Sequence, residues 1–166
     1  MSDKVGLFAG SFDPVTNGHL DLIKRASLLF DKLYVGIFYN QEKQGLFDIP
    51  SRKAMLEAAV SQFDNVEVIT ARDSLAVSIA RSLGVTQLVR GLRNAQDFEY
   101  EAKMAFFNRE LAEEIETVFL LTAPEWLYVS SSGMRELIHF KADISAYVPE
   151  AVVKEVEKKF ENNPKI

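Results

Sequence analysis

Residues 10–19 have the sequence GSFDPVTNGH and follow directly on a short apolar run. Gly10 lets the chain turn sharply beside a ligand, and Ser11 offers both a hydroxyl and a backbone amide. Gly18 and His19 stand where a helix begins, so free N–H groups and the positive end of the helix dipole favour an anion there. A single histidine is usually a packed core residue. Because His19 lies beside a Gly/Ser turn at a strand end, the sequence favours ligand contact for it.

Arg90 and Arg93 form a second cluster, in the sequence RGLR, after another apolar run. Gly91 permits close approach, and planar guanidinium groups can grip phosphate oxygens from a strand end. Most arginine pairs only belong to solvated turns, but the position of this pair favours phosphate binding. Asp97 and Glu101 follow at the i, i+4 spacing that normally marks an exposed helix face. Next to two arginines, Glu101 could accept a hydrogen bond from a ribose or help to hold hydrated magnesium.

A third cluster has the sequence SSSGMR at residues 130–135. Serines before a helix ordinarily serve as N-caps. The same serines present hydroxyls and free amides to a phosphate, and Arg135 lies four residues after Ser131 on the same helix face. The cluster therefore favours nucleotide binding.

Composition predicts a soluble, cytoplasmic protein with one domain over residues 1–166. Its 166 residues, 48% of them hydrophobic and 26% charged, suit a single globular core. The lack of cysteine excludes disulfides, thiolate zinc sites and cysteine nucleophiles, and fits a reducing compartment. A net charge of -5 argues against nucleic acid as a partner. The absence of a signal-peptide run, or of the ~20 apolar residues that a span needs, argues against a membrane.

Short β-rich runs alternate with helical patterns along the chain, and the runs lie at residues 5–9, 32–39, 66–70, 87–90 and 117–122. Most runs are unbroken rather than alternating, which is typical of strands buried on both faces of a parallel sheet. Helical periods between them give the rows Ile23/Ala26/Phe30, Leu56/Ala59/Val60/Phe63 and Tyr100/Met104/Phe107/Leu111. The pattern predicts an α/β fold: a single doubly wound, Rossmann-like domain with a five-stranded parallel sheet and ligands at the carboxyl ends of the strands.

Helix ends also leave signals in the sequence. Pro50 suits the first turn of the second helix, and Asp73 or Ser74 could cap the third. Val152 and Val156 mark a last amphipathic helix, and the polar tail at 161–166 is expected to fray.

The three motifs, with DFEYE at residues 97–101, resemble those of the bacterial phosphopantetheine adenylyltransferases in order and spacing over essentially the whole chain. The first resembles the HxGH signature of the wider nucleotidylyltransferase superfamily, with Thr16 in place of the first histidine. The resemblance implies transfer of an adenylyl group from ATP to 4'-phosphopantetheine, giving dephospho-coenzyme A and pyrophosphate. It further implies Mg²⁺ as the cofactor and a homohexamer as the assembly.

The resemblance also implies residue roles. Around the reacting phosphates it places Ser11, His19, Lys43 and Arg93. Acceptor contacts are Ser11, Lys43, Leu75, Ala76, Arg90, Met104 and Asn108. The ATP site consists of Ser11, Phe12, His19, Gly91, Leu92, Arg93, Glu101, Trp126, Leu127, Tyr128, Val129, Ser130, Ser131 and Ser132. Resemblance alone selects Lys43, since nothing in the sequence favours it over Lys53. Many members have threonine where Ser11 stands, and serine keeps the hydroxyl.

Other functions fit the sequence less well. Relatives that transfer AMP to nicotinamide mononucleotide or CMP to glycerol phosphate usually have histidine where Thr16 stands, and their sequences differ from residues 90–101. A nucleotide sensor without activity would not need both His19 and Lys43. A flavodoxin-like electron carrier shares the predicted sheet but explains neither the arginine pair nor His19.

Overall fold

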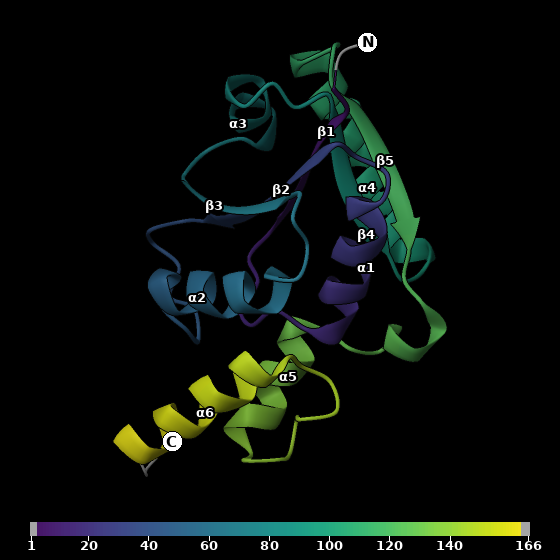
Figure 1. The fold of residues 1–166 in the computed structure, drawn as a ribbon. Helices are drawn as coiled ribbons and strands as arrows, with labels where there is room; N and C mark the ends of the chain where they lie inside the picture. Colours follow the sequence, from purple (N-terminus) through teal and green to yellow (C-terminus); the bar gives the residue numbers. More distant parts are fainter. Residues whose placement is uncertain (1–2, 164–166) are drawn as a thin grey trace.

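A five-stranded parallel sheet with helices on both faces forms the molecule (Figure 1), in a computed structural model that describes residues 3–163. The strands lie in the order β3-β2-β1-β4-β5, and every neighbouring pair is parallel. Their bounds are β1 (Val5–Gly10), β2 (Lys32–Tyr39), β3 (Val66–Arg72), β4 (Gln87–Leu92) and β5 (Glu116–Leu121). The predicted fold and all five predicted strands are confirmed, and the bounds differ by two residues at most.

The helices alternate with the strands until β5 and then follow one another. They are α1 (Asn17–Ser27), α2 (Ile49–Val60), α3 (Ala76–Ser82), α4 (Ala95–Leu111), α5 (Ser131–His139) and α6 (Glu150–Asn162), with the short 3-10 turn η1 (Pro124–Trp126) before α5. In Figure 1, α5 and α6 lie side by side below the sheet, on the side of α1 and α2. Within residues 3–163, no helix is long and apolar enough to cross a membrane.

Neighbouring residues of the central strands point into two separate cores. Phe8 of β1 and Val89 of β4 join the larger core, which is completed by α1, α2, α5 and α6. Leu7 and Leu88 join the smaller core under α3 and the end of α4. Burial of both faces explains why β1 and β4 appear in the sequence as unbroken apolar runs.

Side-chain caps define most helix starts. The Asp48 carboxylate accepts from the backbone N–H of Ser51, and Pro50 lies in the first turn of α2 as predicted. The prediction for α3 is wrong, because its N-cap is Leu75 and no side chain caps it. Asp73 instead has a φ of 45° and accepts a hydrogen bond from the backbone of Gln41, while the Ser74 hydroxyl donates to the Arg72 carbonyl.

Two of the predicted helical rows extend past their helices, and the third is exposed. Phe30 and Phe63 lie beyond the ends of α1 and α2, although Phe30 is still buried. The predicted row on α4 is helical, but its four side chains are between 37% and 61% exposed. The tail predicted to fray begins at residue 161, but α6 continues to Asn162. Residues 164–166 of this tail lie outside the described residues.

Candidate active site

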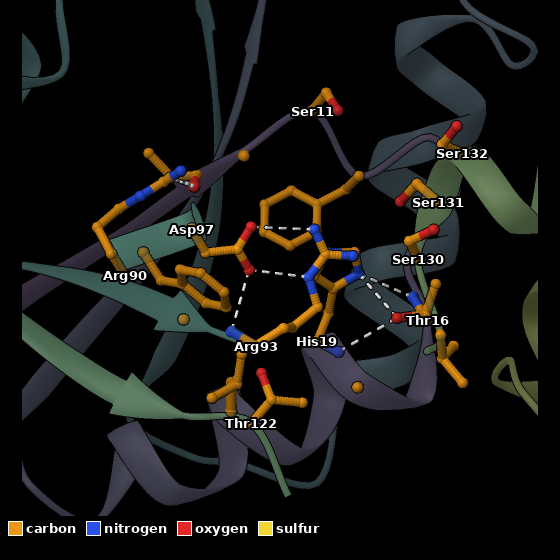
Figure 2. Close-up of a pocket in the computed structure, with 18 of the residues that line it drawn as sticks. Ser11, Thr16, His19, Arg90, Arg93, Asp97, Thr122, Ser130, Ser131 and Ser132 are labelled. Atoms are coloured by element: carbon orange, nitrogen blue, oxygen red, sulfur yellow. Dashed lines mark hydrogen bonds and ion pairs between the residues drawn. The ribbon is translucent and has the colours of Figure 1, made fainter. Parts of the chain in front are cut away.

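A polar cavity of about 360 Å³ opens at the carboxyl end of the sheet, where the β1 loop, the start of α1, the end of β4 and the start of α5 meet (Figure 2). The cavity brings together three motifs that are far apart in the sequence, from Ser11 to Ser132. The predicted residues that line it are Ser11, Phe12, His19, Arg90, Gly91, Arg93, Glu101, Val129, Ser130, Ser131 and Ser132. Loops at the carboxyl ends of parallel strands are the usual ligand site of such sheets.

His19 lies in the wall of this cavity and is fixed by the start of its own helix. The backbone N–H of Thr16 donates to His19 Nδ1 at 3.0 Å, and the His19 N–H donates back to the Thr16 hydroxyl at 3.3 Å. Because Nδ1 accepts a hydrogen bond, the single hydrogen of the neutral ring is on Nε2. The residue that stands in place of a motif histidine therefore sets the orientation and tautomer of His19.

The His19 ring is neutral at pH 7. Burial is the main cause that lowers its pKa, and the positive charges of Arg93 and Arg90 lower it further, from 6.5 to about 4. A neutral ring with its hydrogen on Nε2 can donate a hydrogen bond to a phosphate oxygen without carrying a charge of its own. This arrangement suits a ligand-binding histidine, whereas Ile23 and Ala26 on the same helix are fully buried in the core.

Both arginines of the second motif are paired with carboxylates of α4. Arg90 forms two hydrogen bonds with Glu101, at 2.9 and 2.7 Å, and a third with the Ala9 carbonyl. Arg93 Nε donates to Asp97 Oδ2 at 3.0 Å. Glu101 is only 8% exposed, so it is not on a solvated helix face. The carboxylates hold two cationic groups at the cavity, and Figure 2 shows the Arg93–Asp97 pair next to the His19 ring.

The serine motif both caps α5 and joins it to the first motif. The Ser130 hydroxyl accepts from the backbone N–H of Gly133 at 3.0 Å, as an N-cap does. The Ser131 hydroxyl donates to the Pro14 carbonyl at 2.7 Å, and Arg135 Nη1 donates to the Asp13 carbonyl at 2.9 Å. The first turn of α5 is thereby directed at the cavity, where its N–H groups without helical partners can meet an anion.

A second, more apolar cavity of about 220 Å³ adjoins the first. Four of the residues that the sequence assigned to the acceptor line it: Leu75, Ala76, Met104 and Asn108. Arg90 and Glu101 line both cavities, so this ion pair stands on the boundary between them. The arrangement can hold one polar ligand and one partly apolar ligand with their charged ends close together.

Lys43 lies in the loop between β2 and α2 and lines a third, wide cleft of about 900 Å³. Ser11 lines this cleft and the polar cavity, and Leu75 lines this cleft and the apolar cavity. The cleft thus connects Lys43 to both predicted substrate sites.

Four predicted ATP-site residues are absent from the lining of the polar cavity. Leu92 is buried at the end of β4, and Trp126, Leu127 and Tyr128 belong to the turn around η1, where Tyr128 is 96% exposed. Thr122, which lines the polar cavity, was missed by the sequence analysis. Thr122 could have been found from its position directly after β5, at the same edge of the sheet as the three motifs.

The fold and the cavity define the chain as a nucleotidylyltransferase. A family model described as cytidylyltransferase-like matches residues 7–137. The crystal structure of a Vibrio parahaemolyticus protein named as a nicotinate-nucleotide adenylyltransferase has a TM-score of 0.67, covering 93% of this chain and 99% of that chain at 18% identity. This likeness shows that the two proteins share the fold.

Curated relatives place the chain more narrowly within this class. The phosphopantetheine adenylyltransferase of Streptococcus mutans is 69% identical over 100% of both chains. That of Streptococcus gordonii is 60% identical over 98% of this chain and 100% of its own, and that of Streptococcus sanguinis is 61% identical over 95% and 96%. The chain belongs to the phosphopantetheine adenylyltransferase family.

Proposed function

We propose that the chain transfers the adenylyl group of ATP to 4'-phosphopantetheine, giving dephospho-coenzyme A and pyrophosphate, the penultimate step of coenzyme A biosynthesis. One observation of the geometry carries the proposal: a polar cavity with His19 meets a more apolar cavity at the Arg90–Glu101 pair. ATP fits the chemistry of the first cavity. The pantetheine arm, apolar in part and ending in a phosphate, fits the second with its phosphate toward Arg90.

The reaction needs no nucleophilic side chain. A phosphate oxygen of the acceptor, already ionised near pH 7, attacks the α-phosphorus of ATP and forms a new P–O bond. The bond from that phosphorus to the β-phosphate bridging oxygen breaks, and pyrophosphate leaves with the electron pair. The barrier lies in bringing two polyanions together and spreading charge at the α-phosphorus, which fixed cations and donors lower. Ser11, His19, Lys43 and Arg93 supply those groups.

Mg²⁺ is proposed as the cofactor, bound together with the nucleotide. Magnesium usually keeps several waters and is held by substrate phosphates with one or two carboxylates. Asp97 and Glu101 are the carboxylates that line the polar cavity. No group of three or more potential ligand side chains gathers within residues 3–163, and the residues present fit an ion held mainly by phosphates. The ion would neutralise charge on the leaving pyrophosphate.

A screen of phosphorylated acceptors tests the function. We expect the protein, with ATP and magnesium, to convert 4'-phosphopantetheine to a product heavier by one AMP moiety, measured by mass spectrometry. Nicotinamide mononucleotide with ATP, and glycerol phosphate with CTP, serve as the control reactions. Selective conversion of either control would assign the chain a different acceptor within the superfamily.

The two arginines should differ in the substrate that they affect. Arg90 is proposed to contact the acceptor phosphate and Arg93 the phosphates of ATP. Lysine keeps the charge but loses the planar fork, so Arg90→Lys should raise KM for phosphopantetheine more than for ATP, and Arg93→Lys should affect ATP or kcat. Lost charge-assisted bonds are worth ~1.5–3 kcal/mol, which gives roughly tenfold effects or more.

Steady-state kinetics with each substrate varied separately measure this difference. Arg109→Lys is the matched control, because Arg109 lies at the far end of α4 and lines none of the three cavities. Equal weakening of both substrates by both site variants would mean that the pair acts as one shared positive patch.

The chain is further proposed to be a single nucleotidylyltransferase domain over residues 1–166. We propose that it works in the cytoplasm without a nucleic-acid or membrane partner. We also propose that it assembles as a homohexamer. Support for assembly comes from apolar side chains exposed along α4 and β5, namely Phe98, Tyr100, Phe106, Phe107, Leu111 and Leu121. Apolar area of this kind is typical of subunit interfaces. The segment 75–79, also expected to pack between subunits, contributes exposed Leu75, whereas its Val77 is buried in the smaller core.

Sedimentation at micromolar concentration should show a species near six chains. Phe106→Glu places a charge among the exposed apolar side chains of α4 and should yield smaller species. Leu28→Glu is the control, because Leu28 is also exposed but lies at the end of α1. A wild-type monomer would contradict the hexamer.

A further inference from the structure

We propose that Asp13, Arg52 and Gly45 are positioning residues that hold the loop between β2 and α2, so that Lys43 stays in the cleft beside Ser11. The inference deepens the proposed function and rests on it for the role of Lys43. It starts from an unusual feature of the core: Asp13 and Arg52 are 5% and 6% exposed, although both are charged. Buried charges need partners, and the partners of this pair lie in that loop.

Asp13 holds the end of the loop by accepting two backbone hydrogen bonds. Its Oδ2 accepts from the N–H of Leu46 at 2.8 Å, and its Oδ1 accepts from the N–H of Phe47 at 2.9 Å. Asp13 itself follows β1, and its carbonyl accepts from Arg135 of α5. The loop is therefore fastened to the strand end that carries Ser11 and to the helix that carries the serine motif.

Arg52 adds a second attachment from α2. Its Nε donates to the Phe47 carbonyl at 2.8 Å and lies 3.3 Å from Asp13 Oδ1, and its Nη1 donates to the Ser11 carbonyl at 3.3 Å. One guanidinium thus joins the loop, Asp13 and Ser11. Because Nε and Nη1 are engaged and the side chain is buried, Arg52 has a structural role in the wall of the cleft.

Gly45 lets the loop close over this pair. A Cβ atom on Gly45 would lie 1.6 Å from Arg52 Nη2 and 2.7 Å from Asp13 Oδ2. No other residue type fits at this distance, so a side chain there would push the loop away from the ion pair. Lys43 is two residues before Gly45, and its backbone N–H donates to the Asn40 carbonyl at the end of β2. Lys43 thus lies between two attached points of the loop, Asn40 on one side and Leu46 on the other.

Gly45→Ala is the most informative variant, because it displaces the loop while both buried charges remain. Displacing a reacting group by about 1 Å can cost ~10²-fold, so kcat should fall at least tenfold while KM for ATP changes little. Arg52→Lys keeps the charge but cannot reach three acceptors at once, and should have the same effect. Glu42→Ala in the same loop and Lys53→Ala beside Arg52 are the controls, since neither residue lines the cleft.

A double-mutant cycle shows whether the loop acts through Lys43. Once Lys43→Ala has removed the amine, Gly45→Ala should lower kcat no further, because coupled residues are not additive. Additive losses would overturn the proposal. If Lys43→Ala leaves kcat unchanged, the proposal also fails, whereas the proposed function would still stand on the wild-type activity.

Hydrogen exchange gives a readout that does not depend on the reaction. The amides of Leu46 and Phe47 should exchange faster in Gly45→Ala and Arg52→Lys, while the amides of β1 stay protected. Unchanged exchange at Leu46 and Phe47 would overturn the proposal even if activity falls. A wild-type protein without transferase activity would contradict the proposed function, and the exchange data would still decide whether the cluster holds the loop.

Discussion

Replacement of His19 by alanine should lower kcat by ~10²-fold or more and leave the stability of the fold little changed. The structure gives the physical reason. Thr16 holds Nδ1 as an acceptor, which leaves Nε2–H as the donor of a ring that lines the cavity. Charge that develops on the α-phosphate in the transition state would meet this donor without reorganisation. The ring lines the cavity, but it also contacts Phe12 and accepts from the Thr16 N–H, so its removal should cost the fold only about 1 kcal/mol, as the loss of a helix cap does.

The matched control is His139→Ala, which removes the second histidine of the chain, an exposed residue at the end of α5. Steady-state kinetics and thermal unfolding of both variants would be compared with the wild type. An unchanged kcat for His19→Ala would falsify the catalytic role and return His19 to a structural one.

The pH dependence should follow the lowered pKa of His19. Since that pKa is about 4, protonation of His19 should not reduce kcat until the pH falls well below 6.5. The stability of the fold should also decrease as the pH falls. The unfolded chain takes up a proton near pH 6.5 and the folded chain only near 4, so His19 should reduce the free energy of unfolding as the pH falls through this window.

Pantetheine without its phosphate should give no adenylated product. It lacks the ionised oxygen that attacks the α-phosphorus, and it also lacks the group that Arg90 and Lys43 are proposed to bind. Loss of the nucleophile alone should reduce the rate beyond detection, since an alcohol near pH 7 would need a general base. Mass analysis with both acceptors at equal concentration measures the effect.

The control is ATP binding in the presence of each acceptor, which should be unaffected by loss of the phosphate. Adenylation of the dephosphorylated compound at a comparable rate would contradict both the proposed acceptor and the proposed nucleophile.

The fold was predictable because burial on both faces leaves a direct mark on the sequence. Leu7 and Phe8 enter opposite cores, so β1 must be apolar at successive positions. The start of α3 was not predictable, because Asp73 and Ser74 are good capping residues that bond elsewhere. These side chains could cap α3 or bond to the neighbouring loop and strand end, and the folded structure uses the second option.

The motifs of the site were predictable from their places at strand ends, but their pairings were not. Nothing local joins Arg90 to Glu101, because the two residues are 11 positions apart and the segment between them first has to turn into α4. The buried position of Arg52 could have been predicted from the sequence. It lies four residues before Leu56, on the buried face of α2, where a charge requires a buried partner. The position of Lys43 in the cleft could not be predicted in this way, since its loop is positioned by contacts distant in sequence.

A pyrophosphate-release assay tests the central claim most directly, because it separates an adenylyltransferase from a protein that only binds nucleotide. With ATP, magnesium and 4'-phosphopantetheine, the protein should release pyrophosphate and form dephospho-coenzyme A in equal amounts, and with ATP alone it should release none. Binding of ATP without pyrophosphate release in the presence of the acceptor would contradict the account.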